Sequence, residues 1–280
     1  MSCKKGSTPA PVVPTPGNKA TGCLITKSST APTTRYEYNY TNNKMTSIVG
    51  YYTLLFPEFW STINYTSAGA IGSVVQEIGS KSEFYRPDSY TYNFPNGFFN
   101  PMVETTTHVT GGAIKDNPVG TVINQAKYNI VIGDQNRPSY IKEVYKDIEM
   151  KIYYDDKFNA TQVTYEPLTG VRGKTTIVAT YDDKPNAYVD VPDWKWIVMM
   201  DWMNPDYVVM LTALSQSNPL TISLISTTVL PGSVDYVLNY KITYTYNDKG
   251  LPLTSSTTMT QSTSNYAPYV YQGTFQYTCK

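Results

Sequence analysis

The residues in this sequence best suited to acid–base chemistry are aspartates that stand side by side or a few positions apart. These are Asp155 and Asp156, Asp182 and Asp183, Asp190, Asp193, Asp201 and Asp206. Two carboxylates that flank a bond suffice for glycoside hydrolysis, where one donates a proton and the other activates water or attacks the sugar. Adjacent aspartates in turns more commonly accept hydrogen bonds from backbone amides. We therefore interpret them as turn caps, and a polysaccharide hydrolase that uses an Asp pair is the alternative.

Three of the four tryptophans lie in one short acidic segment, residues 190–206. Its candidate ligand-binding residues are Trp194, Trp196, Trp202, Asp193, Asp201 and Asn204. Stacking of Trp rings on sugar faces, with polar groups that fix the hydroxyls, is one way to hold a carbohydrate. The interpretation that we favour is a plug at the open end of a sheet, because buried Trp belongs mostly to cores. The spacing of apolar residues in Val191–Tyr207 fits a short helix.

Other common chemistries find little support in the sequence. The single His, His108, lies among threonines on a strand-like segment, and a nucleophilic triad needs a positioned base with partners. There is no Gly-rich phosphate loop and no metalloprotease helix motif. One His and no Cys-x-x-Cys spacing argue against zinc. The 22 basic and 22 acidic residues are mixed along the chain, so no basic stripe could neutralise phosphates. We predict no catalytic residue, no metal, no cofactor and no nucleic-acid partner.

The composition favours β structure throughout. The 280 residues include 26 Tyr against 8 Phe, with abundant Thr. Such side chains suit a half-buried pleated surface, where the base packs against a core and the tip reaches water. The mean hydropathy is −0.33, and the chain has no apolar run close to the 18 or so residues that a membrane-spanning helix needs.

Period-two alternation is the clearest structural signal. In Tyr236–Tyr246, apolar and aromatic residues alternate with Asn, Lys and Thr, and the same pattern recurs in Tyr269–Cys279, Tyr36–Tyr40 and Ile148–Tyr154. These are half-buried strands. We predict an all-β fold, a large twisted antiparallel sheet or sandwich of stacked hairpins with one or two short helices. Residues 138–147 fit either a helix or a strand, and residues 52–100 are expected to form irregular strands and loops.

Polar turns with a lysine separate several of these strands. Examples are residues 41–44, 155–159 and 247–250, where Asn, Asp and Gly supply the positive φ angles of tight turns. The unit of Tyr-x-Tyr, polar turn and apolar return strand occurs at least three times. Internal repetition of this kind is typical of stacked hairpins.

The segment YTYNDKGLP at 244–252 resembles the Tyr/Asp repeats of rearrangement-hotspot (YD-repeat) proteins. The whole layout is similar to uncharacterised Bacteroidetes-type envelope lipoproteins with such Tyr-rich sheets. This resemblance implies an all-β envelope protein and supplies no catalytic residues. The turns lack the regular spacing of long YD arrays, which argues against a closed, shell-like barrel.

The N-terminus carries the pattern of a lipid anchor and its tether. Cys3 follows Ser2 and precedes a stretch with Pro9, Pro11, Pro14 and Pro16, which resembles the start of a mature bacterial lipoprotein. On this interpretation Cys3 carries the lipid, and residues 1–19 form the anchor region and a disordered Pro-rich tether that reaches about 50 Å at about 3.1 Å per residue. Residues 20–280 form a single β-rich domain.

Two cysteines remain, Cys23 and Cys279, near the two ends of the folded part. In an oxidising compartment, cysteines at the first and last strands suggest a disulfide, and two free buried thiols are the alternative. Together these features predict a non-enzymatic cell-envelope lipoprotein with a binding or structural role toward a glycan or a partner protein. It would be lipid-anchored in the outer membrane and face the periplasm or the cell surface.

Alanine variants of the three tryptophans distinguish the platform from the plug. If Trp194, Trp196 and Trp202 are plug residues, each substitution should cost about 3–5 kcal/mol, as truncations of large aromatics do in cores. Thermal melts of the three single variants measure this. A variant that melts like the wild type would favour the platform, and Trp202, between Asp201 and Asn204, is the residue that we would then expect to show it.

Overall fold

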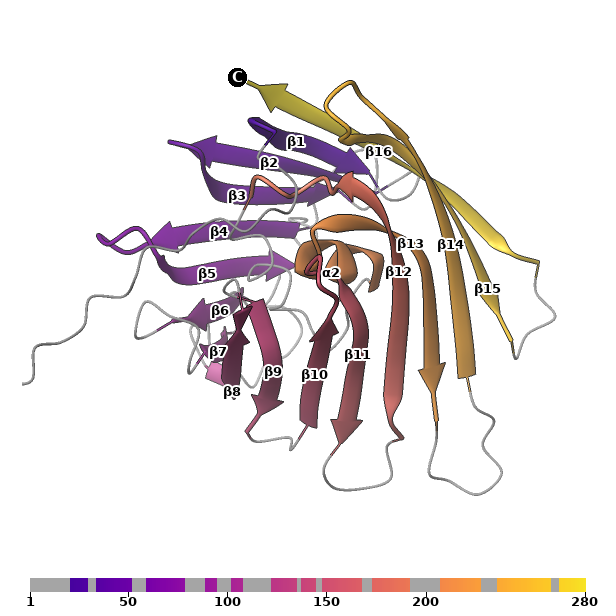
Figure 1. Ribbon diagram of the computed structural model, residues 1–280. Coiled ribbons are helices and arrows are strands. Elements are labelled where there is room, and N and C mark those ends of the chain that lie inside the picture. Colours follow the sequence, from indigo (N-terminus) through magenta and orange to yellow (C-terminus); the bar gives the residue numbers. More distant parts are fainter. Residues whose placement is uncertain are drawn as a thin grey trace, which may run out of the picture.

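The computed structural model describes residues 21–29, 34–51, 59–78, 89–94, 102–107, 122–134, 137–144, 148–167, 173–191, 207–227, 236–262 and 267–280. In this part of the chain, antiparallel strands pair in chain order and close into one barrel, in which β1 pairs with β16 (Figure 1). The strands are β1 Cys23–Ser29, β2 Arg35–Thr41, β3 Lys44–Tyr51, β4 Phe59–Tyr65, β5 Ile71–Ile78, β6 Ser89–Asn93, β7 Met102–Thr107, β8 Val122–Gly133, β9 Arg137–Glu143, β10 Ile148–Tyr154, β11 Ala160–Pro167, β12 Thr175–Pro185, β13 Ser217–Ser226, β14 Tyr236–Tyr246, β15 Pro252–Gln261 and β16 Tyr269–Cys279. The one helix of the described residues is α2, Tyr207–Leu214.

The predicted all-β class, single antiparallel sheet and short helix are confirmed. The sheet is closed, so the expectation from turn spacing that it stays open is wrong. Several strand pairs contain register shifts, for example between Ile25 and Lys27 and between Tyr153 and Tyr154. Because bulges of this kind bend and twist a strand, a sheet can curve to closure without evenly spaced turns. Within residues 52–100, where irregular strands and loops were expected, residues 59–65, 71–78 and 89–93 form regular strands. Residues 137–143 form a strand, which is one of the two alternatives predicted for 138–147.

Short turns gather at the barrel end where β1 begins and β16 ends, called here the Cys23 end. Asn42 and Asn43 take φ angles of 51° and 63° and join β2 to β3, as the two-residue hairpin requires. After β10, the Asp155 carboxylate accepts the amides of Lys157 at 2.9 Å and Asn159 at 2.8 Å. The side-chain oxygen of Asn247 does the same for residues 249 and 251 after β14. The predicted turns at these three places are confirmed.

A repeated tyrosine contact joins pairs of adjacent strands near the Cys23 end. In five strand pairs, the last or nearly last inward tyrosine of an even-numbered strand donates to a backbone carbonyl of the strand before it. The bonds are Tyr40 to Ile25 at 2.8 Å, Tyr65 to Met45 at 2.9 Å, Tyr154 to Pro138 at 2.9 Å, Tyr181 to Ala160 at 2.7 Å and Tyr277 to Pro252 at 2.8 Å. Each bond lets a large aromatic ring pack inside while its hydroxyl keeps a partner.

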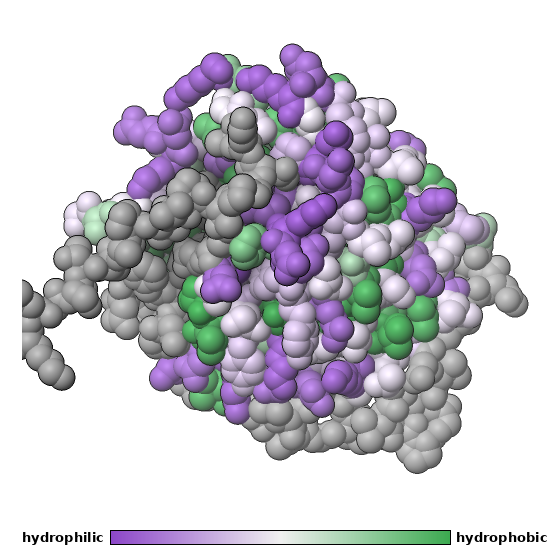
Figure 2. All heavy atoms as spheres, in the orientation of Figure 1, coloured by the Kyte–Doolittle hydropathy of each residue, from purple (hydrophilic) through white to green (hydrophobic). Residues whose placement is uncertain are grey.

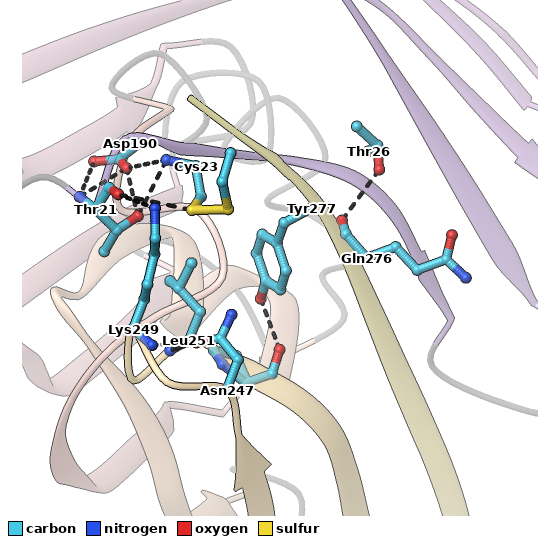
Figure 3. The surroundings of a disulfide bond; sticks show 11 residues. Thr21, Cys23, Thr26, Asp190, Asn247, Lys249, Leu251, Gln276 and Tyr277 are labelled. Atoms are coloured by element: carbon cyan, nitrogen blue, oxygen red, sulfur yellow. Dashed lines mark hydrogen bonds between the residues drawn. A yellow bond between two sulfur atoms is a disulfide. The ribbon is translucent and has the colours of Figure 1, made fainter.

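The seam between the first and last strands is fixed by covalent and polar contacts (Figure 3). Cys23 and Cys279 form a disulfide, which confirms the predicted pair. Beside it, the Asp190 carboxylate accepts the amide of Thr21 at 2.9 Å, its hydroxyl at 2.6 Å and the amide of Cys23 at 3.1 Å. The Lys249 ammonium donates to the Thr21 carbonyl at 3.2 Å. The end of the sheet is therefore held by groups from four distant parts of the sequence, namely residues 21–23, Asp190, Lys249 and Cys279.

Helix α2 lies within the ring of strands (Figure 1). Its sequence, YVVMLTAL, is apolar on nearly every side, as expected of a buried helix. Met210, Leu211 and Leu214 are fully buried in the same core as the inward residues of the wall. Residues 192–206, with the expected helix and its tryptophans, lie outside the described residues. No helix of the described chain is long and apolar enough to cross a membrane.

Side chains from outside the helix donate hydrogen bonds to backbone carbonyls at the C-terminal end of α2. The buried guanidinium of Arg137 on β9 donates to the Leu214 carbonyl. The side-chain amide of Asn186 donates to the Thr212 carbonyl at 3.0 Å and to the Ser215 carbonyl at 2.6 Å. Since the last carbonyls of a helix have no partner within it, these bonds satisfy groups that burial would otherwise leave unpaired. The helix is thereby held in place inside the barrel.

The tyrosine contact is tested by removing one hydroxyl. Tyr277→Phe deletes the bond to Pro252 and should lower the free energy of unfolding by about 1 kcal/mol, the usual net value of such a bond. Tyr153→Phe is the matched control, because Tyr153 is 50% exposed on the outer face, and it should change stability by less than about 0.5 kcal/mol. Denaturant unfolding of both variants measures the difference. Equal stabilities would show that the inward hydroxyl contributes nothing.

Candidate binding pocket inside the barrel

The two faces of the barrel wall differ in chemistry. On β14, Leu238 and Ile242 are buried on the inner face, whereas Lys241, Thr243 and Thr245 are exposed on the outer face. Side chains on the outer face also bond across strands. Examples are Thr245 to Thr254 at 2.7 Å, Gln272 to Ser256 at 2.9 Å, Ser29 to Thr274 at 3.0 Å and Thr180 to Thr221 at 2.6 Å. The interior is mainly apolar and aromatic, although it also buries polar and charged residues such as Gln76, Arg137 and Glu143. The described outer wall is predominantly polar.

The visible surface agrees with this division. On the face shown in Figure 2, hydrophilic and intermediate side chains of the described residues surround scattered apolar ones, with no continuous apolar band across them. Val131, Val178 and Ile225 are among the exposed apolar residues. Isolated residues of this kind are normal on a surface in contact with water.

A pocket lies inside the barrel between α2, residues 187–188 and the inner faces of β14 to β16. The pocket is small: it leaves about 40 Å³ for the centres of water-sized molecules, and the figure of about 500 Å³ is reached only when the part open to solvent is included. The described residues that line it are Ala187, Tyr188, Val208, Val209, Thr212, Asn218, Tyr244, Ser255, Thr257, Tyr271 and Phe275. None of them is acidic or basic. Concave, mainly apolar sites with a few polar groups are the usual form of small-molecule pockets.

Aromatic rings and valines form the apolar walls of this pocket. The rings of Tyr188 and Tyr38 meet edge to face with centroids 5.9 Å apart, and their hydroxyls bond at 2.9 Å. Tyr38 in turn bonds the buried Ser28 hydroxyl at 2.7 Å. Because the Tyr188 hydroxyl already has a partner, this residue can offer the pocket a ring rather than a polar group. Val208 and Val209 complete the apolar wall from the helix side.

Two of the polar lining residues are engaged within the fold. The Thr212 hydroxyl donates to the Val208 carbonyl of its own helix at 2.7 Å. The Asn218 amide donates to the Asp182 carboxylate at 3.1 Å and to the Pro185 carbonyl at 3.2 Å. Ser255 and Thr257, two positions apart on β15, have hydroxyls that no hydrogen bond engages within the described part of the chain. Tyr244 on β14 likewise has a hydroxyl without a hydrogen bond among the described residues, so three hydroxyls of the lining are left to meet a ligand.

The tyrosine hydroxyls of the interior are held in the neutral form. Burial raises the pKa of Tyr244 well above its ordinary value, and the nearby Asp182 carboxylate raises it further. Burial also raises the pKa of Tyr38, Tyr165 and Tyr277. The cause is the cost of placing a phenolate in an apolar environment. The interior therefore carries hydrogen-bonding groups without negative charge on its tyrosines.

The sequence-predicted site residues have different outcomes. Asp155, Asp182 and Asp190 accept hydrogen bonds from backbone amides, as turn capping predicts. Cys3, His108 and the six residues of the Trp segment lie outside the described residues. The predictions for these eight residues are therefore unchanged.

Sequence reasoning missed the pocket residues on α2 and β15. Two patterns in the sequence could have indicated part of the pocket. Tyr271 and Phe275 belong to the predicted inner face of the last strand, and the run 207–214 is apolar on all sides. Neither signal shows that these segments meet, because the helix and the last strand are more than 50 residues apart in the sequence.

Comparison with known proteins adds a likeness in fold. No family model matches the chain, and no curated protein is similar to it in sequence. The structure is similar to that of a porin-like protein from Bacteroides uniformis, with a TM-score of 0.51 and 13% identity, over 95% of this chain and 98% of the other. A porin-like protein from Bacteroides vulgatus gives a TM-score of 0.42 and 10% identity, over 91% and 98% of the two chains. At 13% identity, the first likeness shows the fold alone.

The buried tyrosines predict loss of stability at alkaline pH. Their folded pKa lies above 10.0, so the folded state keeps protons that the unfolded chain releases. The contribution of these tyrosines to the free energy of unfolding is therefore fully present below about pH 10. It falls as pH rises above this value, by about 1.4 kcal/mol per pH unit for each such tyrosine. Urea unfolding across this range measures the slope. Tyr165→Phe should reduce the slope of the free energy of unfolding against pH by the contribution of one tyrosine. An unchanged slope would contradict a raised pKa for Tyr165.

Proposed function

We propose that this chain is a non-enzymatic envelope protein that holds a small ligand inside a barrel whose outer wall faces water. The observation that carries the proposal is the division of the wall, with an apolar, pocket-bearing interior and an outer face of Thr, Ser, Asn, Gln and Lys. Large barrels that enclose a cavity are a common way to bury a ligand.

The same division argues against an open pore. A barrel with as many strands as a porin has a wall long enough to surround a water-filled channel, and its lipid-facing surface carries an apolar band. Here α2 and the inward aromatic residues occupy the interior, and the outer strand faces bear hydroxyl and amide side chains. A wall of this chemistry would leave polar groups without partners if it faced hydrocarbon.

An envelope location has three sources of support. The Ser2-Cys3 start with its Pro-rich stretch resembles a lipoprotein anchor and tether. The disulfide fits an oxidising compartment. The fold is similar to that of a porin-like protein of Bacteroides. On the proposed arrangement, a lipid on Cys3 attaches the chain to the outer membrane while the barrel itself stays in water.

Separating the anchor from the barrel tests the proposal. The full chain is expressed behind a lipoprotein signal peptide, with and without Cys3→Ser, and tested for detergent partitioning and for channel activity in planar bilayers. The wild type should follow the detergent phase through its lipid, and the variant should stay in the aqueous phase as a single species. Neither should conduct ions. A Cys3→Ser variant that inserts into bilayers and gives discrete conductance steps would show that the barrel spans the membrane and would overturn the proposal.

A further inference from the structure

We infer that the pocket beside α2 binds the hydroxymethyl group of a neutral hexopyranose, with the sugar ring in the part of the pocket that is open to solvent. This ligand class rests on the proposed function and specifies the occupant of the same pocket. Three properties of the lining support it: its size, its three unengaged hydroxyls and the exposed aromatic surface beside it.

The enclosed part of the pocket has the size of a few waters. It leaves about 40 Å³ for the centres of water-sized molecules. Since one water needs about 10–15 Å³ by this measure, there is room for about three water-sized groups. A hydroxymethyl group, with its one carbon and one oxygen, fits this space, whereas a whole sugar ring does not. The ring would therefore lie in the open part, which brings the volume to about 500 Å³.

The three unengaged hydroxyls are neighbours on the inner face of the wall. Tyr244 on β14 stands directly opposite Ser255 on β15, and Thr257 follows two positions along β15. A Cβ at position 273, which pairs with Ser255, would collide with the Ser255 hydroxyl, so Gly273 leaves the space in which this hydroxyl stands. Thr257 is only 2% exposed, and its hydroxyl has no hydrogen bond among the described residues. Because a buried hydroxyl needs a partner, that partner must come from the pocket.

The group that enters the pocket must reproduce the hydrogen bonds that water would make there. A hydroxyl of the ligand can both donate to and accept from the hydroxyls of the lining. Burial and the Asp182 carboxylate raise the pKa of Tyr244, so its hydroxyl stays protonated and can donate. The described lining residues include no cation. A uronic acid, with a carboxylate in place of the hydroxymethyl group, would therefore lose its hydration without a compensating charge.

Aromatic rings continue from the pocket to the solvent along the inner face of β16. Phe275 and Tyr271 line the pocket, and the ring centroid of Tyr269 lies 5.7 Å from that of Tyr271. Tyr269 is 55% exposed. The C–H faces of a pyranose are apolar and pack on aromatic faces, which carry partial negative charge. This aromatic surface favours a sugar over other small molecules that carry a hydroxymethyl group.

Titration of the full chain with methyl pyranosides, followed by the NMR signals of the protein, tests this ligand class. The hexosides are those of glucose, galactose and mannose. Each is paired with the pentoside that lacks only the hydroxymethyl group (xyloside, arabinoside or lyxoside) and with the uronide of the same configuration. At least one hexoside should bind. Its pentoside and its uronide should each have a Kd at least about tenfold higher.

Hydroxyl-deleting variants locate the binding site. In Tyr244→Phe/Thr257→Val, the Kd for the bound hexoside should rise at least about tenfold, the equivalent of about 1.4 kcal/mol or one net hydrogen bond. Thr258→Val on the outer face of β15 is the matched control and should bind like the wild type. The comparison of hexoside with pentoside needs only the wild type, so it decides the ligand class even if the double variant does not fold.

The outcomes separate the ligand class from the proposed function. Acetamide and methyl acetate, small neutral molecules of other classes, are titrated in the same way. The ligand class is overturned and the proposed function stands if a hexoside binds no better than its pentoside or uronide, if the double variant keeps the wild-type Kd, or if only acetamide or methyl acetate shifts the signals of the pocket residues. If no probe of either kind shifts these signals, the interior does not hold a small ligand and both fail.

Discussion

Closure of the sheet between β1 and β16 is the constraint on which the rest of the structure depends. The strands that meet there come from the two ends of the sequence, and closing the barrel between them requires long-range contacts that a local turn cannot supply. The Cys23–Cys279 disulfide, the Asp190 carboxylate and Lys249 all act at this point. In the chain-entropy account, a cross-link over a separation of 256 residues lowers the conformational entropy of the unfolded chain. This raises the free energy of the unfolded state by up to about 5 kcal/mol.

Once the sheet is closed, strand alternation divides the side chains between two environments. The inner face requires side chains that fill volume and leave no polar group unpaired. Tyrosine meets both requirements, because its ring packs in the core and its hydroxyl donates to a carbonyl of the neighbouring strand. Threonine and serine serve the outer face, where they bond one another across strands. The same rule that stabilises the wall therefore creates a mainly apolar compartment, and α2 fills part of it and leaves a small pocket beside the helix. Structure and proposed function follow from one pattern of alternation.

The features that the sequence predicted are those that depend on neighbours in the chain. The faces of β14 and β16, the positive φ angles at Asn42 and Asn43 and the turn caps at Asp155 and Asn247 are local, and each follows from residue type. The disulfide could be predicted because few cysteines were available. Closure and the pocket could not, because Val208, Ser255 and Phe275 are far apart in the sequence and come together only in the folded chain. The bulges that bend the strands carry no sequence signal of comparable strength.

Site-specific labelling of the barrel wall in intact outer membranes tests the central claim most directly. Single variants Thr258→Cys and Gln272→Cys place a thiol on the outer face, and Thr257→Cys places one on the inner face. With a membrane-impermeant maleimide, the account predicts rapid labelling of the two outer positions and slow labelling of the inner one. Protection of the outer positions together with rapid labelling of the inner position would mean a wall in lipid around a water-filled lumen, and would contradict the account.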